Sequence, residues 1–88
     1  MISLTLYSRP GCHLCDDMKA VVQRVAGSRG IAIEIVDISA DSQLEARYGL
    51  EIPVLLVDGK KAAKYRVSEE ELTRILIART GGTGGPGG

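Results

Sequence analysis

The only two cysteines of this 88-residue chain lie in one short segment, YSRPGCHLCDD, at residues 7–17. Cys12 and Cys15 are separated by two residues and come just before a run of residues that favour helix. Cysteines with this spacing can form a structural disulfide, supply half of a metal site, or work as a redox pair. Each alternative places a different demand on the rest of the chain.

A purely structural disulfide between Cys12 and Cys15 would stabilise the fold only weakly. In the chain-entropy model, closing so short a loop contributes about 2 kcal/mol, less than a longer loop would. The small ring also strains the disulfide, which makes it easier to reduce. No targeting segment is visible, so we expect a cytoplasmic protein, and stable structural disulfides are rare in that compartment.

A metal site needs more ligands than the cysteine pair provides. Zinc takes four ligands in structural sites, and Cys12 and Cys15 supply two. His13 is the one histidine of the chain, but it lies between the cysteines and cannot easily join both sulfurs on one ion. This alternative would require a site shared between two chains, and our prediction is that no metal is bound.

The elements around the cysteines favour the redox alternative. Residues 2–7, ISLTLY, alternate apolar and polar side chains, which is the period of a strand. The apolar residues that follow recur at helical spacing and form one stripe: Leu14, Met18, Val21, Val22 and Val25. Cys12 is therefore predicted at a helix N-terminus, where unpaired N–H groups and the helix dipole favour a thiolate. Cys15, one turn further along and beside the stripe, would be shielded and suited to resolving a mixed disulfide.

The remaining sequence predicts further elements of one small α/β domain. Residues 27–30, GSRG, end the first helix, and the β-branched residues 31–38 predict a second strand. A strand, a helix and a strand joined by short links form a right-handed parallel crossover. Residues 39–49 then predict a short helix that Gly49 ends.

A hairpin and a last helix complete the predicted domain. The hairpin covers residues 52–65 and turns at Asp58-Gly59, and Ser68 begins a capping box before the helix. The predicted order is β-α-β-α-β-β-α over residues 1–80. Residues 81–88, GGTGGPGG, carry no side chains that could bury surface, and we expect a disordered tail there.

Charge and composition argue against two classes of partner. The chain has 11 basic and 11 acidic residues, so no overall field attracts nucleic acid or an anionic membrane surface. Its only aromatic residues are three tyrosines, which offer few platforms for stacking bases. No stretch approaches the length of a membrane span. We expect a monomer that binds neither nucleic acid nor membrane.

Two segments resemble those of a known family. YSRPGCHLC resembles the active-site segment of the glutaredoxins, and ARYGLEIPVLLVDGK (46–60) is similar to the segment that carries the cis-proline of thioredoxin-fold proteins. The resemblance covers about residues 2–80 in element order and is closest to small bacterial glutaredoxin-like proteins. It implies a thioredoxin fold, with a four-stranded mixed sheet and three flanking helices.

The resemblance also implies roles for particular residues. Cys12 would attack a disulfide of a protein or small molecule, and Cys15 would resolve the mixed disulfide. Pro53 would be the cis-proline, and the backbone of Ile52 would pair with an extended substrate. Arg9 would hold a substrate carboxylate and Tyr7 would contact the substrate, although exposure to solvent and strand packing are the simpler interpretations of these two.

Two departures from the family pattern affect the expected redox potential and the expected reductant. The dipeptide between the cysteines is His13-Leu14, where glutaredoxins favour Pro-Tyr. Residues 64–72, KYRVSEEEL, lack the glycine pair by which glutaredoxins approach glutathione, and their glutamates oppose a second anion. We therefore expect no bound cofactor, with glutathione as a weak reductant or a reductase as partner.

Two functions of other classes are also open. One is a non-catalytic module that pairs with extended peptides beside Pro53. The other is a carrier that holds a metal or cluster through Cys12 and Cys15.

Overall fold

A mixed four-stranded sheet forms the centre of the protein. The computed structural model describes residues 2–81, and the side chains of residues 2–79. The strands lie in the order β2-β1-β3-β4, with bounds Ile33–Asp37, Leu4–Ser8, Val54–Val57 and Lys60–Lys64. β1 pairs parallel with β2 and antiparallel with β3, and β4 closes the hairpin with β3.

Three α-helices flank this sheet, in the predicted order β-α-β-α-β-β-α. Their bounds are α1 His13–Ser28, α2 Ser42–Tyr48 and α3 Glu69–Gly81, and a short 3₁₀ turn, η1, covers Ile38–Ala40. The fold class predicted from the sequence is confirmed. The predicted tail covers residues 81–88. Its first residue, Gly81, is the last residue of α3, and residues 82–88 lie outside the described part of the chain.

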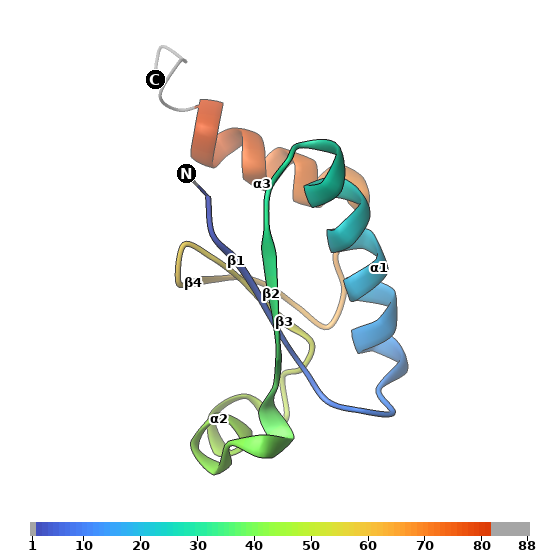
Figure 1. Ribbon diagram of the computed structural model, residues 1–88, viewed down its shortest axis with the longest axis vertical. Coiled ribbons are helices and arrows are strands. Elements are labelled where there is room, and N and C mark those ends of the chain that lie inside the picture. The colour runs from blue at the N-terminus through green and yellow to red at the C-terminus, as the bar shows by residue number, and fades with distance from the viewer. Residues whose placement is uncertain (1, 82–88) are drawn as a thin grey trace.

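The sheet is covered on both faces, but unequally. α1 and α3 lie side by side on one face, and α2 packs on the other near the end of β2 (Figure 1). Alternate residues of the central strands point to the two sides, so Leu6 and Leu55 enter the larger cluster while Val54 and Leu56 enter the smaller. The smaller cluster consists of Ile38, Tyr48, Val54 and Leu56.

Short-range signals fix the ends of most elements. Ser68 accepts a hydrogen bond from the N–H of Glu71 at 3.0 Å, which is half of the predicted capping box. The β2 strand ends earlier than predicted, at Asp37, because the Asp37 carboxylate accepts the N–H of Ser39 and turns the chain into η1. After α1 the left-handed residue is Gly30, with φ 68°.

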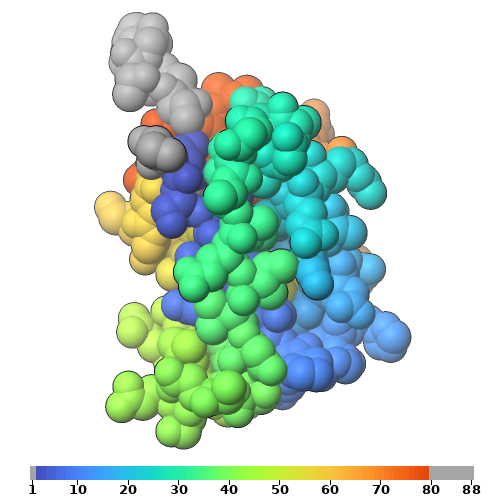
Figure 2. All heavy atoms as spheres, in the orientation of Figure 1, coloured from blue at the N-terminus to red at the C-terminus, as the bar shows by residue number. Residues whose placement is uncertain are grey.

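The two outer strands present different edges to solvent. β2 runs uncovered along the face seen in Figure 2, where Ile35 is 38% exposed and Glu34 faces solvent. β4 carries Lys60, Lys61 and Lys64 and has an irregular register opposite Leu55 and Leu56. Lysines and irregularities on an edge strand disfavour pairing with a second sheet. No helix in residues 2–81 has the length and apolar composition that a membrane crossing requires.

Asp58 joins the hairpin turn to both ends of the described chain. One carboxylate oxygen accepts the N–H of Ser3 at 2.9 Å, and the other accepts two hydrogen bonds from Arg79 at 2.6 and 3.2 Å. These bonds, led by the one from Arg79, hold the pKa of the Asp58 carboxyl below its usual value. Burial opposes the shift without reversing it.

We expect Asp58→Asn to lower the melting temperature at pH 7, because the amide loses the charge that Arg79 binds. Asn tolerates the left-handed backbone of this position, φ 53°, so the turn itself is retained. The folded-state pKa is lowered, so the stabilisation is complete above the unfolded pKa of about 3.9 and is lost as the pH falls through the folded value. The difference between variant and parent should therefore shrink below about pH 4.

Thermal unfolding followed by circular dichroism between pH 7 and pH 3 measures this difference. Glu34→Gln makes the same charge change on the exposed face of β2 and serves as the control. An equal loss in that control, or a loss that does not depend on pH, would contradict the interpretation.

Candidate active site

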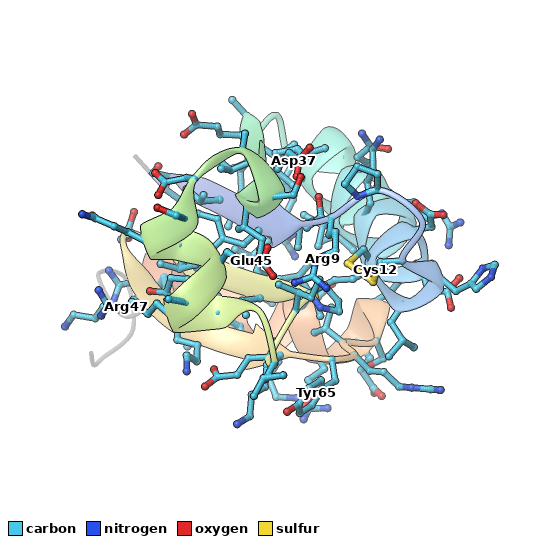
Figure 3. The ribbon with its side chains drawn as sticks, turned by 90° about the horizontal axis from the view of Figure 1, so that it is seen from below. Arg9, Cys12, Asp37, Glu45, Arg47 and Tyr65 are labelled. Atoms are coloured by element: carbon cyan, nitrogen blue, oxygen red, sulfur yellow. A yellow bond between two sulfur atoms is a disulfide. The ribbon has the colours of Figure 1, made fainter. Side chains whose placement is uncertain are left out.

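Strand pairing brings the cysteine loop and the Pro53 loop to one end of the sheet. Tyr7, near the end of β1, lies opposite Val54, the first residue of β3, in an antiparallel pair. The chain that leaves β1 toward Cys12 and the chain that enters β3 through Pro53 therefore meet at this end. Figure 3 views the molecule from that side, with Cys12 and Arg9 near the centre.

Cys12 is the N-cap residue of α1. Its backbone is extended, with φ −97° and ψ 112°, and its Sγ accepts a hydrogen bond from the N–H of Cys15 at 3.1 Å. Gly11 precedes it with φ 79°, a left-handed conformation that favours glycine. The predicted position at a helix N-terminus is thus observed, and a thiolate there would be stabilised by the helix dipole and the free N–H groups.

The two cysteines form a disulfide and differ in their surroundings. Their Cα atoms are 5.1 Å apart. Cys12 is half-buried, whereas Cys15 is 3% exposed among the core residues. In the reduced protein, an incoming disulfide would therefore reach Cys12 before Cys15.

Arg9 is paired with α2. Its guanidinium donates to the carboxylate of Glu45 and lies 3.5 Å from the carbonyl oxygen of Gly49. Gly49 is the C-cap of α2 with φ −55°, so its role is spatial. A Cβ at this position would lie 2.5 Å from the Glu45 carbonyl oxygen and 3.2 Å from the Arg9 guanidinium, which leaves no room for a larger residue.

Asp37 contributes a second carboxylate near Arg9. The Ser39 hydroxyl and then the Ser39 N–H donate to Asp37, and these bonds lower the pKa of its carboxyl. The charge of Arg9 lowers this pKa further, although burial acts in the opposite direction. Arg9 therefore lies within the field of two acidic side chains, Glu45 and Asp37. All three residues are labelled in Figure 3.

The loop before β3 is held by Lys61 of β4 and by Tyr65, the residue that follows β4. The N–H of Tyr65 donates to the carbonyl of Pro53 at 2.9 Å, and its hydroxyl lies 3.3 Å from the carbonyl of Leu50. Lys61 of β4 pairs with Glu51 of the loop. The Ile52–Pro53 peptide bond is cis, Pro53 is buried, and Ile52 packs against the smaller cluster.

Tyr7 packs against another ring in this structure. Its ring centroid lies 4.8 Å from that of Tyr48, which is buried in the smaller cluster. Arg47 and Lys61 place cationic groups 5.3 and 5.9 Å from the centroid of the Tyr48 ring. Strand packing thus accounts for the position of Tyr7, and its contact with a substrate stays a prediction.

The described residues offer no ready-made metal site. Within residues 2–81, no group of three or more histidine, cysteine or acidic side chains is arranged to hold an ion. His13 is exposed as the first residue of α1. A shared site between two chains would have to be built from Cys12, Cys15 and residues of a second copy.

Three residues near the site were not singled out from the sequence: Glu45, Tyr48 and Tyr65. Glu45 lies 36 residues from Arg9, and nothing in the local sequence indicates that the two pair. Tyr65 adopts φ 69°, which a bulky residue rarely does. A glycine or asparagine at this position would have indicated a left-handed backbone, and a tyrosine does not. The packing of α2 against the sheet is what brings Tyr48 onto Tyr7.

The fold and the cysteine pair at the start of α1 define a thioredoxin-fold protein of the glutaredoxin-like type. The family model "Glutaredoxin-like domain (DUF836)" matches residues 3–76, and the chain belongs to this family. The family predicted from the sequence is thereby confirmed.

Known proteins similar to this chain include a relative described as glutaredoxin-like and two solved structures that share its fold. A curated relative is the glutaredoxin-like protein YDR286C homolog of Dictyostelium discoideum, 29% identical over 77 residues, with 81% of this chain and 71% of the relative covered. The structure of target protein XcR50 from X. campestris is 35% identical, has a TM-score of 0.73, and covers 85% of this chain and 96% of its own. A mutant thioredoxin from Halobacterium salinarum, 23% identical with a TM-score of 0.61 and coverage of 88% and 73%, shares the fold.

The capping role of Cys12 predicts an order of stability among variants of the reduced protein. Cys12→Ser should be more stable than Cys12→Ala by about 1 kcal/mol, because serine can accept the same N–H and alanine cannot. Urea unfolding in the presence of a reductant measures this difference.

Position 15 provides the matched control. Cys15 is buried and caps nothing, so serine there should have no advantage over alanine. If serine is favoured equally at both positions, or at neither, capping by residue 12 is not the cause.

Proposed function

We propose that this protein is a thiol–disulfide oxidoreductase in which Cys12 is the attacking and Cys15 the resolving cysteine. The observation that carries the proposal is the difference between the two sulfurs. Cys12 is half-buried at the N-terminus of α1, while Cys15 is buried one turn further on. A nucleophile needs access and a stabilised thiolate, whereas a resolving thiol needs only to reach its neighbour.

The reaction proceeds in two exchanges. The Cys12 thiolate attacks one sulfur of a substrate disulfide, forms a mixed disulfide with it, and releases the other sulfur as a thiolate that takes up a proton. Cys15 then loses its proton and attacks Cys12, which forms the Cys12–Cys15 disulfide and releases the second substrate thiol. Counting the proton that Cys12 gives up to solvent when it forms its thiolate, the substrate gains two electrons and two protons, and the dithiol protein loses them.

Substrate would bind where the two loops meet. The Ile52 backbone precedes the cis peptide bond to Pro53, at the same end of the sheet as Cys12. The hydrogen bond from Tyr65 and the pairing of Lys61 with Glu51 hold this loop in place. Pairing of an extended substrate segment with the Ile52 backbone would add to the contact that a substrate disulfide makes with one sulfur.

Two electrons and two protons must return to the disulfide in each cycle. A reductase, or two molecules of glutathione acting weakly, would supply them, and a reducing compartment such as the cytoplasm suits this cycle. The first turn of α3 carries Glu69, Glu70 and Glu71, which oppose a second anion at that helix N-terminus. We propose a monomer without a resident cofactor.

Variants of the two cysteines should behave differently toward a small neutral disulfide. Cys15→Ser should accumulate a mixed disulfide with half of bis(2-hydroxyethyl) disulfide, because Cys12 can attack but the product cannot be resolved. Cys12→Ser should accumulate little, because its remaining thiol is buried. Intact-protein mass spectrometry without reductant measures both.

Two results would count against the proposal. Trapping by Cys12→Ser alone would reverse the roles of the two cysteines. Trapping by neither variant, under conditions in which both are folded, would mean that the pair is no oxidoreductase and would favour a binding module.

A further inference from the structure

The charged groups next to the cysteines are arranged around Arg9. One pocket beside Cys15 is lined by two basic side chains, Arg9 and Lys19, and two acidic ones, Asp16 and Asp37. Arg9 reaches from this pocket to Glu45, a carboxylate on α2. With Glu45 included, acidic groups outnumber basic ones at this surface.

One nitrogen of the Arg9 guanidinium, Nη2, is already engaged by α2. A free arginine beside a reactive sulfur would bind an incoming carboxylate, because its planar fork matches carboxylate geometry. Here one arm of that fork, Nη2, donates to Glu45, and the missing side chain of Gly49 leaves the space in which the two side chains meet. An anionic substrate must compete with Glu45 to bind both arms of the Arg9 fork, and it also meets the charge of Asp37.

We propose that Glu45 is a specificity-determining residue, which engages Arg9 and so makes the cysteine site select neutral or cationic disulfides over anionic ones. This inference rests on the proposed function, since it names the substrate class of the same site. The side chains of Arg9 and Glu45 are 38% and 40% exposed, so a ligand can reach the pair and compete for it. The same exposure lets Glu45→Gln keep the fold, as glutamine is a similarly good helix former.

The test is a binding measurement on the disulfide form of the full chain, in which no exchange occurs. S-methylglutathione, which carries two carboxylates, and its diethyl ester, which carries none, are titrated separately and followed by NMR. The ratio of their dissociation constants measures how strongly the site favours or disfavours carboxylates. A general change in pocket shape would affect both ligands and so would leave the ratio nearly unchanged.

We expect Glu45→Gln to strengthen binding of the acid relative to the ester by about fivefold. This is the scale of one exposed arginine–carboxylate contact. In an Arg9→Gln background, the same Glu45→Gln change should shift it by less than about twofold, because only screened long-range charge remains. Glu34→Gln, on the exposed edge strand β2, makes the same change in net charge and should leave the ratio unaltered.

Several results would overturn the inference. The first is that Glu45→Gln leaves the ratio unchanged or that the acid shows no measurable binding to this variant. The second is that Glu34→Gln shifts the ratio as much as Glu45→Gln does. The third is that Glu45→Gln shifts the ratio equally with and without Arg9. None depends on catalysis, so failure of the cysteine variants to trap a mixed disulfide would reject the proposed function separately.

Discussion

Burial of β3 on both faces, and of its partner β1 on one face, is the constraint on which the remaining structure depends. All four residues of β3 are buried, and its partner β1 contributes Leu4 and Leu6 to the larger cluster. Strands buried in this way must be paired on both sides and covered by helices, which determines where α1, α2 and α3 lie. Because β1 and β3 are antiparallel, the same constraint puts the loop after β1 beside the loop before β3.

Much of this arrangement could be predicted from the sequence because its signals are local. Each of four local signals predicts an element from a few neighbouring residues: the alternation in ISLTLY, the apolar stripe that begins at Leu14, the turn at Asp58-Gly59 and the cap at Ser68. The position of Cys12 at a helix start followed from the same signals. The resemblance to glutaredoxins added Pro53, which composition alone would not have marked.

The features that could not be predicted are those set by tertiary contact. The partner of Arg9 lies on a different element, and its identity depends on how α2 is turned against the sheet. Tyr65 takes a left-handed backbone because its N–H is fixed on Pro53, which outweighs the intrinsic preference of a bulky residue. Gly49 looked like a simple helix end, yet the lack of a side chain there makes room for a pair of charges.

The small size of the α2 layer has a consequence for motion. α2 has seven residues, fewer than a helix needs to be stable alone, and it rests on a cluster far smaller than the one beneath α1 and α3. Its amide protons should therefore exchange with solvent through local opening, while those of α1 wait for global unfolding. Each such opening carries Glu45 away from Arg9. The charge that an incoming molecule meets at the cysteines is thus coupled to the folding equilibrium of a single short helix.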